Sequence, residues 1–299
     1  MILEENKDTV FFSSLFARHY RSLYNEIRKI LRTEGIPCEL VKGTKDYWCR
    51  DYMPVQADGH SFVQFRYHPD YLHGRREFET DTDAVMKKSF PMLHTIRLPF
   101  IADGGNFVMA PGRDGKRCVI MTMKTRYENH DVHDGGPVIV ESMVNSIVKD
   151  SLHCDAVINI PWDEDDELGH ADGIVRFAGY SKRGIPRVLV NRKLYDRFYS
   201  GSVLSILKEH FQVIDLDLSS YDELSWAYIN ALQASRCIIV PGIGLPTDEE
   251  ALRQYEKLFP SYLGHIHMVQ MRDFIKEWNG ALNCLSWTIK SDRSQYTGE

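Results

Sequence analysis

The stretch NGALNCLSW, residues 279–287, is a polar, Gly-bearing break followed by an apolar run, and four earlier stretches share its build. They are WCRDYMPVQ (48–56), ADGGNFVMA (102–110), LGHADGIVRF (168–177) and SWAYINALQ (225–233). Successive breaks are 52, 69, 58 and 54 residues apart, counted between the markers Asp51, Asp103, Asp172, Asn230 and Cys284. Units that recur in this way are typical of repeat architectures, in which each unit packs against its neighbours. We therefore expect a five-bladed, pseudo-symmetric α/β-propeller with the breaks at its centre. The alternative is that an ordinary α/β chain shows similar breaks by chance.

Apolar periodicity along the chain alternates between strand and helix. Short apolar runs predict strands at Thr9–Phe12, Val119–Thr122, Val188–Val190, Phe211–Ile214 and Cys237–Val240. Segments of helical period predict helices at Ala17–Leu31, Val138–Val148, Leu194–His210 and Glu249–Leu258. This order indicates an α/β fold. Because no Pro-, Gly- or Ser-rich linker divides the chain, we expect one domain over residues 1–299, with a flexible polar tail at 290–299.

Composition narrows the function classes. A formal net charge of −6 and a pI near 6.1 argue against a nucleic-acid-binding surface and suit a small cationic partner. The acidic N-terminus is unlike a signal peptide, and no apolar run approaches the roughly 20 residues that span a bilayer, so we expect a cytoplasmic protein with no membrane contact. The six cysteines form no C-x-x-C pair, which indicates free thiols and neither a metal nor a redox cofactor.

Cys284 is a candidate nucleophile. A lone cysteine is more often a small buried hydrophobe, and a catalytic one needs a histidine or another cation to populate its thiolate. In GHAD, His170 and Asp172 are two residues apart, so on an extended segment both side chains point into the same space. One can transfer protons while the other holds a positive charge. The alternatives are a structural histidine beside a turn aspartate, or two ligands of a metal site that has no evident third ligand.

Two further breaks carry acids. Asp51 is flanked by Tyr47, Trp48 and Tyr52, and a carboxylate among aromatic rings suits a planar cation such as guanidinium. An Arg50–Asp51 structural ion pair is the alternative. Asp103, in Asp103-Gly-Gly-Asn106, could orient a histidine, although the glycines alone also explain a tight turn.

Two polar segments have simpler interpretations. The run Trp162–Glu167 contains five consecutive acids and is either a solvated loop or a rim that attracts cations to a site. The loop at Gly242–Glu250 lacks the Gly-Lys-Ser/Thr ending of a phosphate loop and has three acids in its first helical turn. We expect a helix capped by Thr247 there.

Taken in order, these motifs resemble the guanidine-modifying enzyme superfamily, the pentein fold, and within it the agmatine deiminases related to bacterial peptidylarginine deiminases. The resemblance covers most of the chain. It rests on Trp48-x-Arg-Asp51, Asp103-Gly-Gly-Asn106, Gly169-His-x-Asp172, Ser225–Asn230 followed by Ile238–Pro241 and Pro246-x-Asp-Glu-Glu-Ala251, and Asn283-Cys284.

The resemblance implies a role for each matched residue. Cys284 would attack the guanidinium carbon, and His170 would protonate the departing ammonia and later activate water. Asp51 and Asp172 would grip the guanidinium nitrogens, and Asp103 would orient His170. Trp48 and Asn230 are the expected substrate-binding residues. No metal or cofactor is implied, and a homodimer is a possible assembly.

This sequence departs from the family pattern at three places. Asp103 stands where the family usually has Glu, Asn283 where it has His before the cysteine, and Arg50-Asp-Tyr-Met-Pro54 where it has Arg-Asp-x-Gly-Pro. We expect a hydrolase that converts a guanidine to a ureido group, with agmatine as substrate and N-carbamoylputrescine as product. Alternatives are free or peptidyl arginine, amidino transfer, a non-catalytic binder of cationic ligands, and a metal-dependent hydrolase built on His170 and Asp172.

Overall fold

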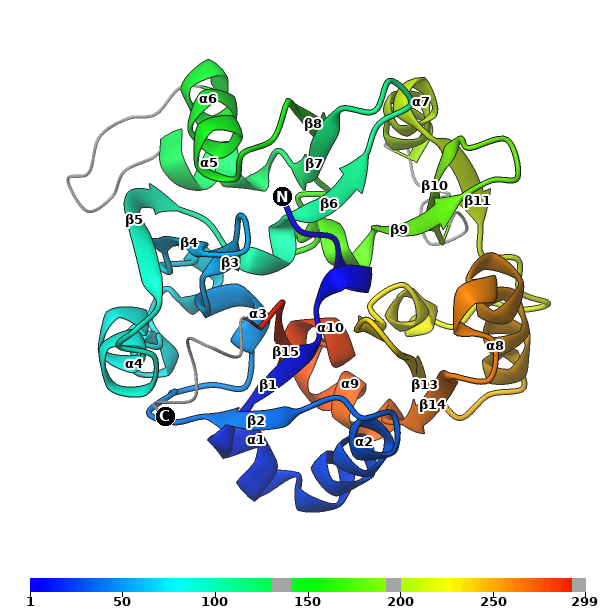
Figure 1. Cartoon of the computed structure of the whole chain (residues 1–299), viewed down its shortest axis with the longest axis horizontal. Coiled ribbons are helices and arrows are strands. Elements are labelled where there is room, and N and C mark those ends of the chain that lie inside the picture. Colours follow the sequence, from blue (N-terminus) through cyan, green and yellow to red (C-terminus); the bar gives the residue numbers. More distant parts are fainter. Residues whose placement is uncertain (131–140, 192–199, 292–299) are drawn as a thin grey trace.

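Five small sheets surround a common centre in a computed structural model that describes residues 1–130, 141–191 and 200–291 (Figure 1). Each sheet has three strands, and its middle strand pairs antiparallel with one neighbour and parallel with the other. Helices connect the middle strand to its parallel neighbour and lie on the outside of the ring. The repeated arrangement confirms the predicted five-bladed α/β-propeller.

The bounds of the elements show how each unit is assembled. In sheet order the strands are β15 Ser286–Ile289, β1 Thr9–Ser13 and β2 Cys38–Val41; β3 Val55–Gln56, β4 Ser61–Arg66 and β5 His94–Ile101; β6 Val108–Pro111, β7 Arg117–Thr122 and β8 Ala156–Ile160; β9 Val175–Tyr180, β10 Pro186–Val190 and β11 Gln212–Asp215; β12 Leu232–Gln233, β13 Ile238–Gly242 and β14 Ile266–Gln270. The α-helices are α1 Ser14–His19, α2 Arg21–Thr33, α3 Cys49–Tyr52, α4 Thr82–Ser89, α5 Lys124–His130, α6 Glu141–Ser151, α7 Ser200–His210, α8 Thr247–Leu258, α9 Arg272–Trp278 and α10 Leu282–Leu285. Short 3-10 helices are η1 Glu4–Asn6, η2 Asp70–Leu72, η3 Arg76–Phe78, η4 Gly104–Asn106, η5 Ala171–Gly173, η7 Ser225–Tyr228 and η8 Pro260–Tyr262.

One sheet is shared by the two ends of the chain. β15 pairs antiparallel with β1, so that Ile289 lies opposite Thr9 and Ser286 opposite Phe12. β1 also pairs in parallel with β2, after the α1 and α2 crossover. The last strand therefore completes the first unit and closes the ring.

Short helical turns bring each unit to the centre. α10, α3, η4, η5 and η7 precede the strands β15, β3, β6, β9 and β12. Cys284 lies in α10, Asp51 in α3 and Asp172 in η5; Asp103 directly precedes η4, and Asn230 follows η7. Because α10 packs against α3, α3 against η4, and η4 against η5, the five breaks meet as predicted.

The strand sequences fit burial on both faces. All residues of β1 and of β13 are buried, which explains their continuous runs of apolar and small residues in place of strict alternation. α2 buries Tyr24, Ile27 and Leu31, whose spacing of three and four residues places them on one face of the helix. That face packs into the core with β1 and its neighbours.

The predicted elements are present, with shifts at their ends. The five predicted strands lie within or overlap β1, β7, β10, β11 and β13. The predicted helix Ala17–Leu31 is instead two helices, because Tyr20 leaves the helical conformation and packs edge-on against Phe274, with ring centroids 4.8 Å apart. Parts of the predicted helices at 138–148 and 194–210, and the tail from 292, lie outside the described residues.

The predicted cap of α8 is wrong. Thr247 is the first residue of the helix, and its hydroxyl contacts the Tyr228 hydroxyl at 2.9 Å instead of capping a backbone amide. Asp248 in the first turn binds the preceding loop instead, accepting the backbone N–H groups of Ile243 and Gly244 at 2.8 and 2.9 Å. Thr247 does not cap because it lies inside the helix, whereas a capping side chain belongs to the residue directly before it, which here is Pro246.

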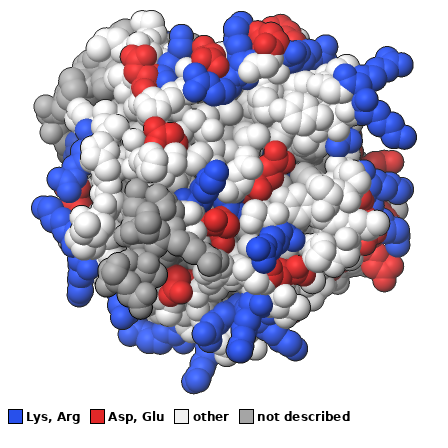
Figure 2. Space-filling model, in the orientation of Figure 1, with Lys and Arg blue, Asp and Glu red and all other residues white. Residues whose placement is uncertain are grey.

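The face of the molecule seen in Figure 1 carries both signs of charge. In Figure 2, Lys and Arg side chains gather along the lower rim, whereas acidic and basic side chains lie near one another around the centre. Among the residues that the structure describes, no helix is both long enough and apolar enough to cross a bilayer.

Candidate active site

The sulfur of Cys284 lies in a polar environment at the centre of the ring. It is 3.6 Å from Oδ2 of Asp172 and 3.2 Å from Nδ2 of Asn230. Only 8% of the residue is exposed. The structure thus brings together a thiol and an acid that are 112 residues apart in sequence.

Asn230 supports the turn that carries the thiol. Its Oδ1 accepts the backbone N–H groups of Asn283 and Cys284 at 3.0 and 3.2 Å, and its Nδ2 donates toward the sulfur. The residue has no exposed surface. The described contacts of Asn230 therefore hold the nucleophile turn, whereas the substrate contact that the resemblance implies stays a prediction.

His170 lies between two of the predicted acids. Its Nε2 is 3.0 Å from Oδ2 of Asp103, and its Nδ1 is 3.6 Å from Oδ1 of Asp51. The backbone N–H of Gly105 donates to the same Asp51 oxygen at 3.0 Å. Asp103 therefore reaches the imidazole, although its side chain is one methylene shorter than the Glu that the guanidine-modifying enzymes usually have at this position. The contact also leaves Nδ1 facing the centre of the cluster.

Asp172 is held in place by a residue of the turn that carries the nucleophile. Asn283 donates through Nδ2 to Oδ2 of Asp172 at 2.6 Å. The guanidinium of Arg50 in turn donates to Oδ1 and to the backbone carbonyl of Asn283, at 3.1 and 3.3 Å. Arg50 also pairs with Glu4 at 3.4 Å. Arg50 therefore bridges Asn283 and Glu4, in place of the Arg50–Asp51 ion pair that was the alternative interpretation of this motif.

A small space beside Gly105 is bounded by three of these groups. A Cβ atom placed on Gly105 would lie 2.6 Å from Oδ1 of Asp51, 2.9 Å from Nδ1 of His170 and 3.4 Å from Oδ2 of Asp172. Real Cβ atoms essentially never approach other atoms as closely as the first two distances. Glycine is therefore required here for the three polar atoms to converge.

Burial and negative charge control the protonation of the cluster. Burial raises the pKa of the Cys284 thiol well above its usual value, and the charges of Asp172 and Asp51 raise it further. Burial also raises the pKa of Asp51, against the opposing effect of His170. Burial alone would lower the pKa of His170, but Asp51 and Asp103 outweigh it and raise that pKa to about 10. These pKa shifts favour a protonated thiol and a charged imidazole, and the acids around them would attract a cation.

A cleft of about 690 Å³ meets this cluster at Tyr71, whereas Cys284, His170 and the three acids do not line it. Trp48 lines it and packs its ring against Gly280, close to α10, and Tyr71 lines it while donating to Oδ2 of Asp103 at 3.0 Å. The acidic run contributes Asp165, Asp166 and Glu167 to the wall, which favours the rim over the solvated loop as its interpretation. Other acids in the wall are Asp46 and Glu277. The cleft therefore combines aromatic surfaces with negative charge.

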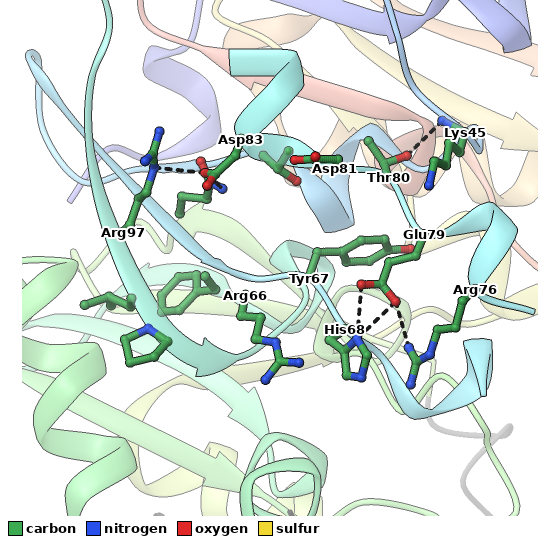
Figure 3. A pocket seen from close by; sticks show the side chains of 15 residues that line it. Lys45, Arg66, Tyr67, His68, Arg76, Glu79, Thr80, Asp81, Asp83 and Arg97 are labelled. Carbon is green, nitrogen blue, oxygen red and sulfur yellow. Dashed lines mark hydrogen bonds and ion pairs between the residues drawn. The ribbon is translucent and has the colours of Figure 1, made fainter. Parts of the chain in front are cut away.

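A second cavity, also of about 690 Å³, lies beside the cleft and shares Lys45 and Tyr67 with it (Figure 3). Its charged groups are largely paired with one another. Glu79 lies 3.0 Å from His68 and 2.9 Å from Arg76, and Asp83 pairs with Arg97 at 2.9 Å. None of the predicted site residues lines it, so it is not the candidate active site.

The four arginines considered for a substrate carboxylate differ in position. Arg50 is buried against Asn283, and Arg76 is paired with Glu79. Arg66 lines only the second cavity. Arg75 lines the cleft, where it donates to the backbone carbonyl of Tyr71 at 2.8 Å.

Sequence reasoning missed several residues of this site. Tyr71 lies in no motif, and Gly105 belongs only to the Gly-Gly pair. Asp46 lies two residues before Trp48 but outside the motif that contains it. Asn283 entered the sequence analysis as part of the Asn283-Cys284 motif and as a departure from the family pattern, without a predicted role. Within the described residues, no group of three His, Cys, Asp or Glu side chains is arranged to hold a metal ion.

A ring of five α/β units with a cysteine, a histidine and three acids at its centre defines a pentein-type α/β-propeller. The sequence matches the Porphyromonas-type peptidyl-arginine deiminase family over residues 14–289, and the chain belongs to this family. None of the curated proteins matches the sequence.

Solved structures share the fold at low sequence identity. The agmatine deiminase of C. jejuni has a TM-score of 0.73 at 17% identity, covering 97% of this chain and 95% of that one. An agmatine deiminase of Enterococcus faecalis has a TM-score of 0.67 at 14% identity, with 97% and 95% covered. The DDAH of Pseudomonas aeruginosa, complexed with citrulline, has a TM-score of 0.56 at 12% identity, with 94% and 99% covered.

Proposed function

We propose that the protein is a deiminase that converts a guanidine to a ureido group and releases ammonia. The observation that carries the proposal is the convergence of His170, Asp51 and Asp172 on the space beside Gly105, with the Cys284 sulfur 3.6 Å from Asp172. A guanidinium is a poor electrophile because its charge is delocalised, so its reaction needs acids that hold it and a soft nucleophile aligned with its carbon.

In this proposal Asp51 and Asp172 bind the guanidinium nitrogens while the Cys284 sulfur faces the central carbon. As the cation enters, the thiol releases its proton to the solvent, because the added positive charge offsets the negative charges of Asp172, 3.6 Å from the sulfur, and Asp51. The sulfur attacks the carbon, and the His170 imidazolium gives its proton to the leaving nitrogen, which departs as ammonia. A covalent amidino-thioether remains.

Water completes the reaction. Neutral His170 takes a proton from a water molecule, whose oxygen attacks the carbon of the thioether. The carbon–sulfur bond then breaks, and the ureido product leaves with the thiol restored. Asp103, bound to Nε2, keeps Nδ1 of His170 directed toward the reacting atoms.

Agmatine is the substrate we propose, with N-carbamoylputrescine as product, which would place the enzyme in putrescine biosynthesis. The support comes from the cleft wall, where Asp165, Asp166, Glu167 and Glu277 offer carboxylates to a cationic amine tail. Free or peptidyl arginine is the second candidate, because Arg75 in the same wall is the cation that could meet a carboxylate. Family membership and shared fold at 14–17% identity support deimination in general.

The test is an ammonia-release panel over agmatine, arginine, methylarginines and arginyl peptides. We expect agmatine to be consumed fastest, Cys284→Ala to abolish turnover, and chelators to have no effect. Cys38→Ala, which removes a partly buried thiol near Tyr24, is the matched control. If no guanidine is consumed, the deiminase proposal fails, and binding without turnover would favour a non-catalytic binder. Ureido product formed only with an amine acceptor would indicate amidino transfer.

A further inference from the structure

Arg50 places a guanidinium of the protein itself close to the centre at which the proposed substrate guanidinium binds. The residue is buried, with 9% of its surface exposed. Its Nη2 donates to Oδ1 of Asn283 at 3.1 Å, and Nδ2 of the same amide donates to Oδ2 of Asp172 at 2.6 Å. A single amide group thus separates the Arg50 guanidinium from one of the two acids proposed to hold the substrate.

Two connections join Arg50 to Glu4, which lies in the short helix η1. Nη1 of Arg50 pairs with Oε1 of Glu4 at 3.4 Å. The hydroxyl of Thr288 makes the second connection, because it donates to Oε2 of Glu4 at 2.7 Å and accepts Nη2 of Arg50 at 3.1 Å. Nζ of the buried Lys7 also lies 2.6 Å from Oε1 of Glu4. Both carboxylate oxygens of Glu4 are therefore connected to Arg50.

η1 is located where it can act on the site. In Figure 1 the blue segment that contains η1 passes across the centre of the ring. A small space of about 40 Å³ borders η1 and shares no lining residue with the cleft. The charged residues that line this space are Glu4, Glu5, Arg50, Asp172 and Arg176. Glu4 and Asp172 thus border the same space as Arg50 and are alternative partners for its guanidinium.

Glu4 is ionised and offsets the charge of Arg50. Burial alone would raise the pKa of Glu4, but Lys7 and Arg50 outweigh it and lower that pKa to about 2. A buried cation that loses its acidic partner is left with an uncompensated charge, which attracts any other acid within reach. Of the acids that would remain beside the space, Asp172 is the one that Asn283 already connects to Arg50. Pairing with Glu4 therefore keeps Arg50 from neutralising Asp172.

We propose that Glu4 is a positioning residue: its charge holds the Arg50 guanidinium beside η1, so that Asp172 and Asp51 stay available to the guanidinium of the substrate. The inference deepens the proposed function and rests on it for the identity of the bound cation. Without Glu4, a guanidinium of the protein would compete with the substrate for the same acid. In its observed position Arg50 orients the amide of Asn283 without taking up the charge of Asp172.

The direct test measures the binding of guanidinium ion by NMR titration of wild type and Glu4→Gln. Glutamine keeps the length of the side chain and an acceptor oxygen but carries no charge. We expect the dissociation constant to rise by roughly 10-fold, because the uncompensated charge of Arg50 repels the added cation and attracts Asp172.

Glu5→Gln is the matched control. It removes the same charge from the same helix beside the same space, and within the described residues Glu5 forms neither a hydrogen bond nor an ion pair. We expect Glu5→Gln to bind guanidinium ion as wild type does. Equal dissociation constants for Glu4→Gln and Glu5→Gln overturn the proposal.

A double variant separates the role of Glu4 from its contribution to folding. Glu4→Gln leaves Lys7 buried without its acidic partner, as well as Arg50. Combining Glu4→Gln with Lys7→Met removes that second cation and still leaves Arg50 uncompensated. We expect the double variant to bind guanidinium ion roughly 10-fold more weakly than Lys7→Met alone. Equal binding overturns the proposal, also where Glu4→Gln by itself does not fold.

The reactivity of Cys284 gives a readout that needs no guanidine. Alkylation by iodoacetamide, followed at Cys284 by mass spectrometry over a pH range, reports the thiolate. Burial raises the pKa of this thiol, and the charges of Asp172 and Asp51 raise it further. In Glu4→Gln the midpoint of alkylation should fall by roughly one pH unit, because Arg50 then offsets the charge of Asp172. A midpoint equal to that of Glu5→Gln overturns the proposal. The variants leave unchanged the other ionisable groups at the centre, which are Asp51, Asp103, His170 and Asp172.

Removal of the Arg50 charge distinguishes this effect from a general loosening of the structure. In an Arg50→Met background, Glu4→Gln should leave the midpoint of Cys284 alkylation unchanged, because no guanidinium remains for Glu4 to hold. A loosened structure would expose the thiol with or without Arg50. A shift of the same size in both backgrounds therefore overturns the proposal.

Turnover separates the inference from the proposed function. In Glu4→Gln, KM should rise more than kcat falls, because the variant weakens binding of the cation and leaves Cys284 and His170 in place. If wild type is active and Glu4→Gln has the KM of Glu5→Gln, only the inference fails. If wild type consumes no guanidine, the proposed function fails, whereas the alkylation midpoints still decide whether Glu4 acts on the centre through Arg50.

Discussion

At the scale of single residues, the surroundings of Cys284 are unfavourable for a free thiolate. The sulfur lies 3.6 Å from an acid, is largely buried and has a raised pKa because of that burial and the Asp172 and Asp51 charges. Most catalytic thiols are activated by a nearby positive charge. Here the strongest source of positive charge would be the substrate itself, placed between the two acids.

This leads to a prediction about thiolate formation. We expect thiolate absorbance, measured as the difference between wild type and Cys284→Ala, to appear only above neutral pH in the free protein. Guanidinium ion has the charged group of the proposed substrate but no tail to bind in the cleft. Its addition should move the titration of the thiol to lower pH, because a cation offsets the negative charges of the acids. A dominant thiolate at pH 7 in the free protein would contradict substrate-assisted activation.

Asn283 is the residue at which this chain departs from the family pattern beside its nucleophile. It joins Arg50 to Asp172, donating to that carboxylate at 2.6 Å. We predict that Asn283→Ala lowers kcat/KM by roughly 10- to 100-fold, the effect of losing one hydrogen bond to a charged group. Thr288→Val is the control, since it removes a different partner of Arg50 and leaves the contact with Asp172 intact. Equal losses in the two variants would show that Asn283 acts only through packing of Arg50.

At the scale of elements, the central turns decide the geometry of the site. α3, η4 and η5 pack in sequence, and each is too short to bury an apolar face of its own. Their positions are instead fixed by close contacts, such as the approach of Gly104 in η4 to the backbone carbonyl of Arg50 in α3. Rigid turns at the end of packed sheets can hold polar groups within the tolerance that catalysis needs.

A methyl group in η4 tests this view. We predict that Gly105→Ala reduces turnover by at least roughly 100-fold, because the new Cβ would meet Asp51 and His170 within the space proposed for the guanidinium. Gly173→Ala in η5 is the matched control, where the nearest atom to a Cβ is in the Trp226 ring at an ordinary 3.8 Å. Both variants should be assayed for ammonia release and for thermal unfolding. Full activity of Gly105→Ala would mean that the guanidinium does not occupy this space.

Much of the element order could be predicted from the sequence, because apolar periodicity and polar breaks are local signals. The five breaks that hold Asp51, Asp103, Asp172, Asn230 and Cys284 were found in this way. The division of the first long helix at Tyr20 could not be found, since it depends on packing against Phe274, more than 250 residues away. The contact between Tyr71 and Asp103, 32 residues apart in the chain, was missed for the same reason.

At the scale of the whole molecule, closure of the ring brings the nucleophile to its partners. β15 follows α10 directly and pairs with β1, so the last turn of the chain is fixed against the first unit. The recurring spacing predicted five units, but it gave no information that one sheet is shared by both ends. Pairing between residues such as Thr9 and Ile289 is a long-range contact without a local signal.

The same convergence leaves the folded protein with an unusual proton balance. Asp46, Glu128 and His170 have pKa values of 3.8, 4.5 and 6.5 when unperturbed, and about 7, 8 and 10 in the folded protein. Burial is the largest cause of the first two increases, whereas for His170 the neighbouring Asp51 and Asp103 overcome the opposing effect of burial. A group whose pKa is raised by folding binds more protons in the folded state, so its contribution to stability is lost as pH rises through the folded value.

We therefore predict that the free energy of unfolding of the unliganded protein decreases steadily between about pH 4 and pH 10, because all three groups act in the same direction over adjoining intervals. Urea unfolding at about pH 5, 7 and 9 measures this decrease directly. His170→Gln should flatten the curve above about pH 7, because His170 is the only one of the three groups whose contribution extends from there to about pH 10. Asp46→Asn should instead flatten the part below about pH 7. A free energy of unfolding that rises from pH 5 to 9 would show that the acids at the centre are ionised and paired in the unliganded protein. It would also remove the electrostatic reason for expecting a cation at the centre.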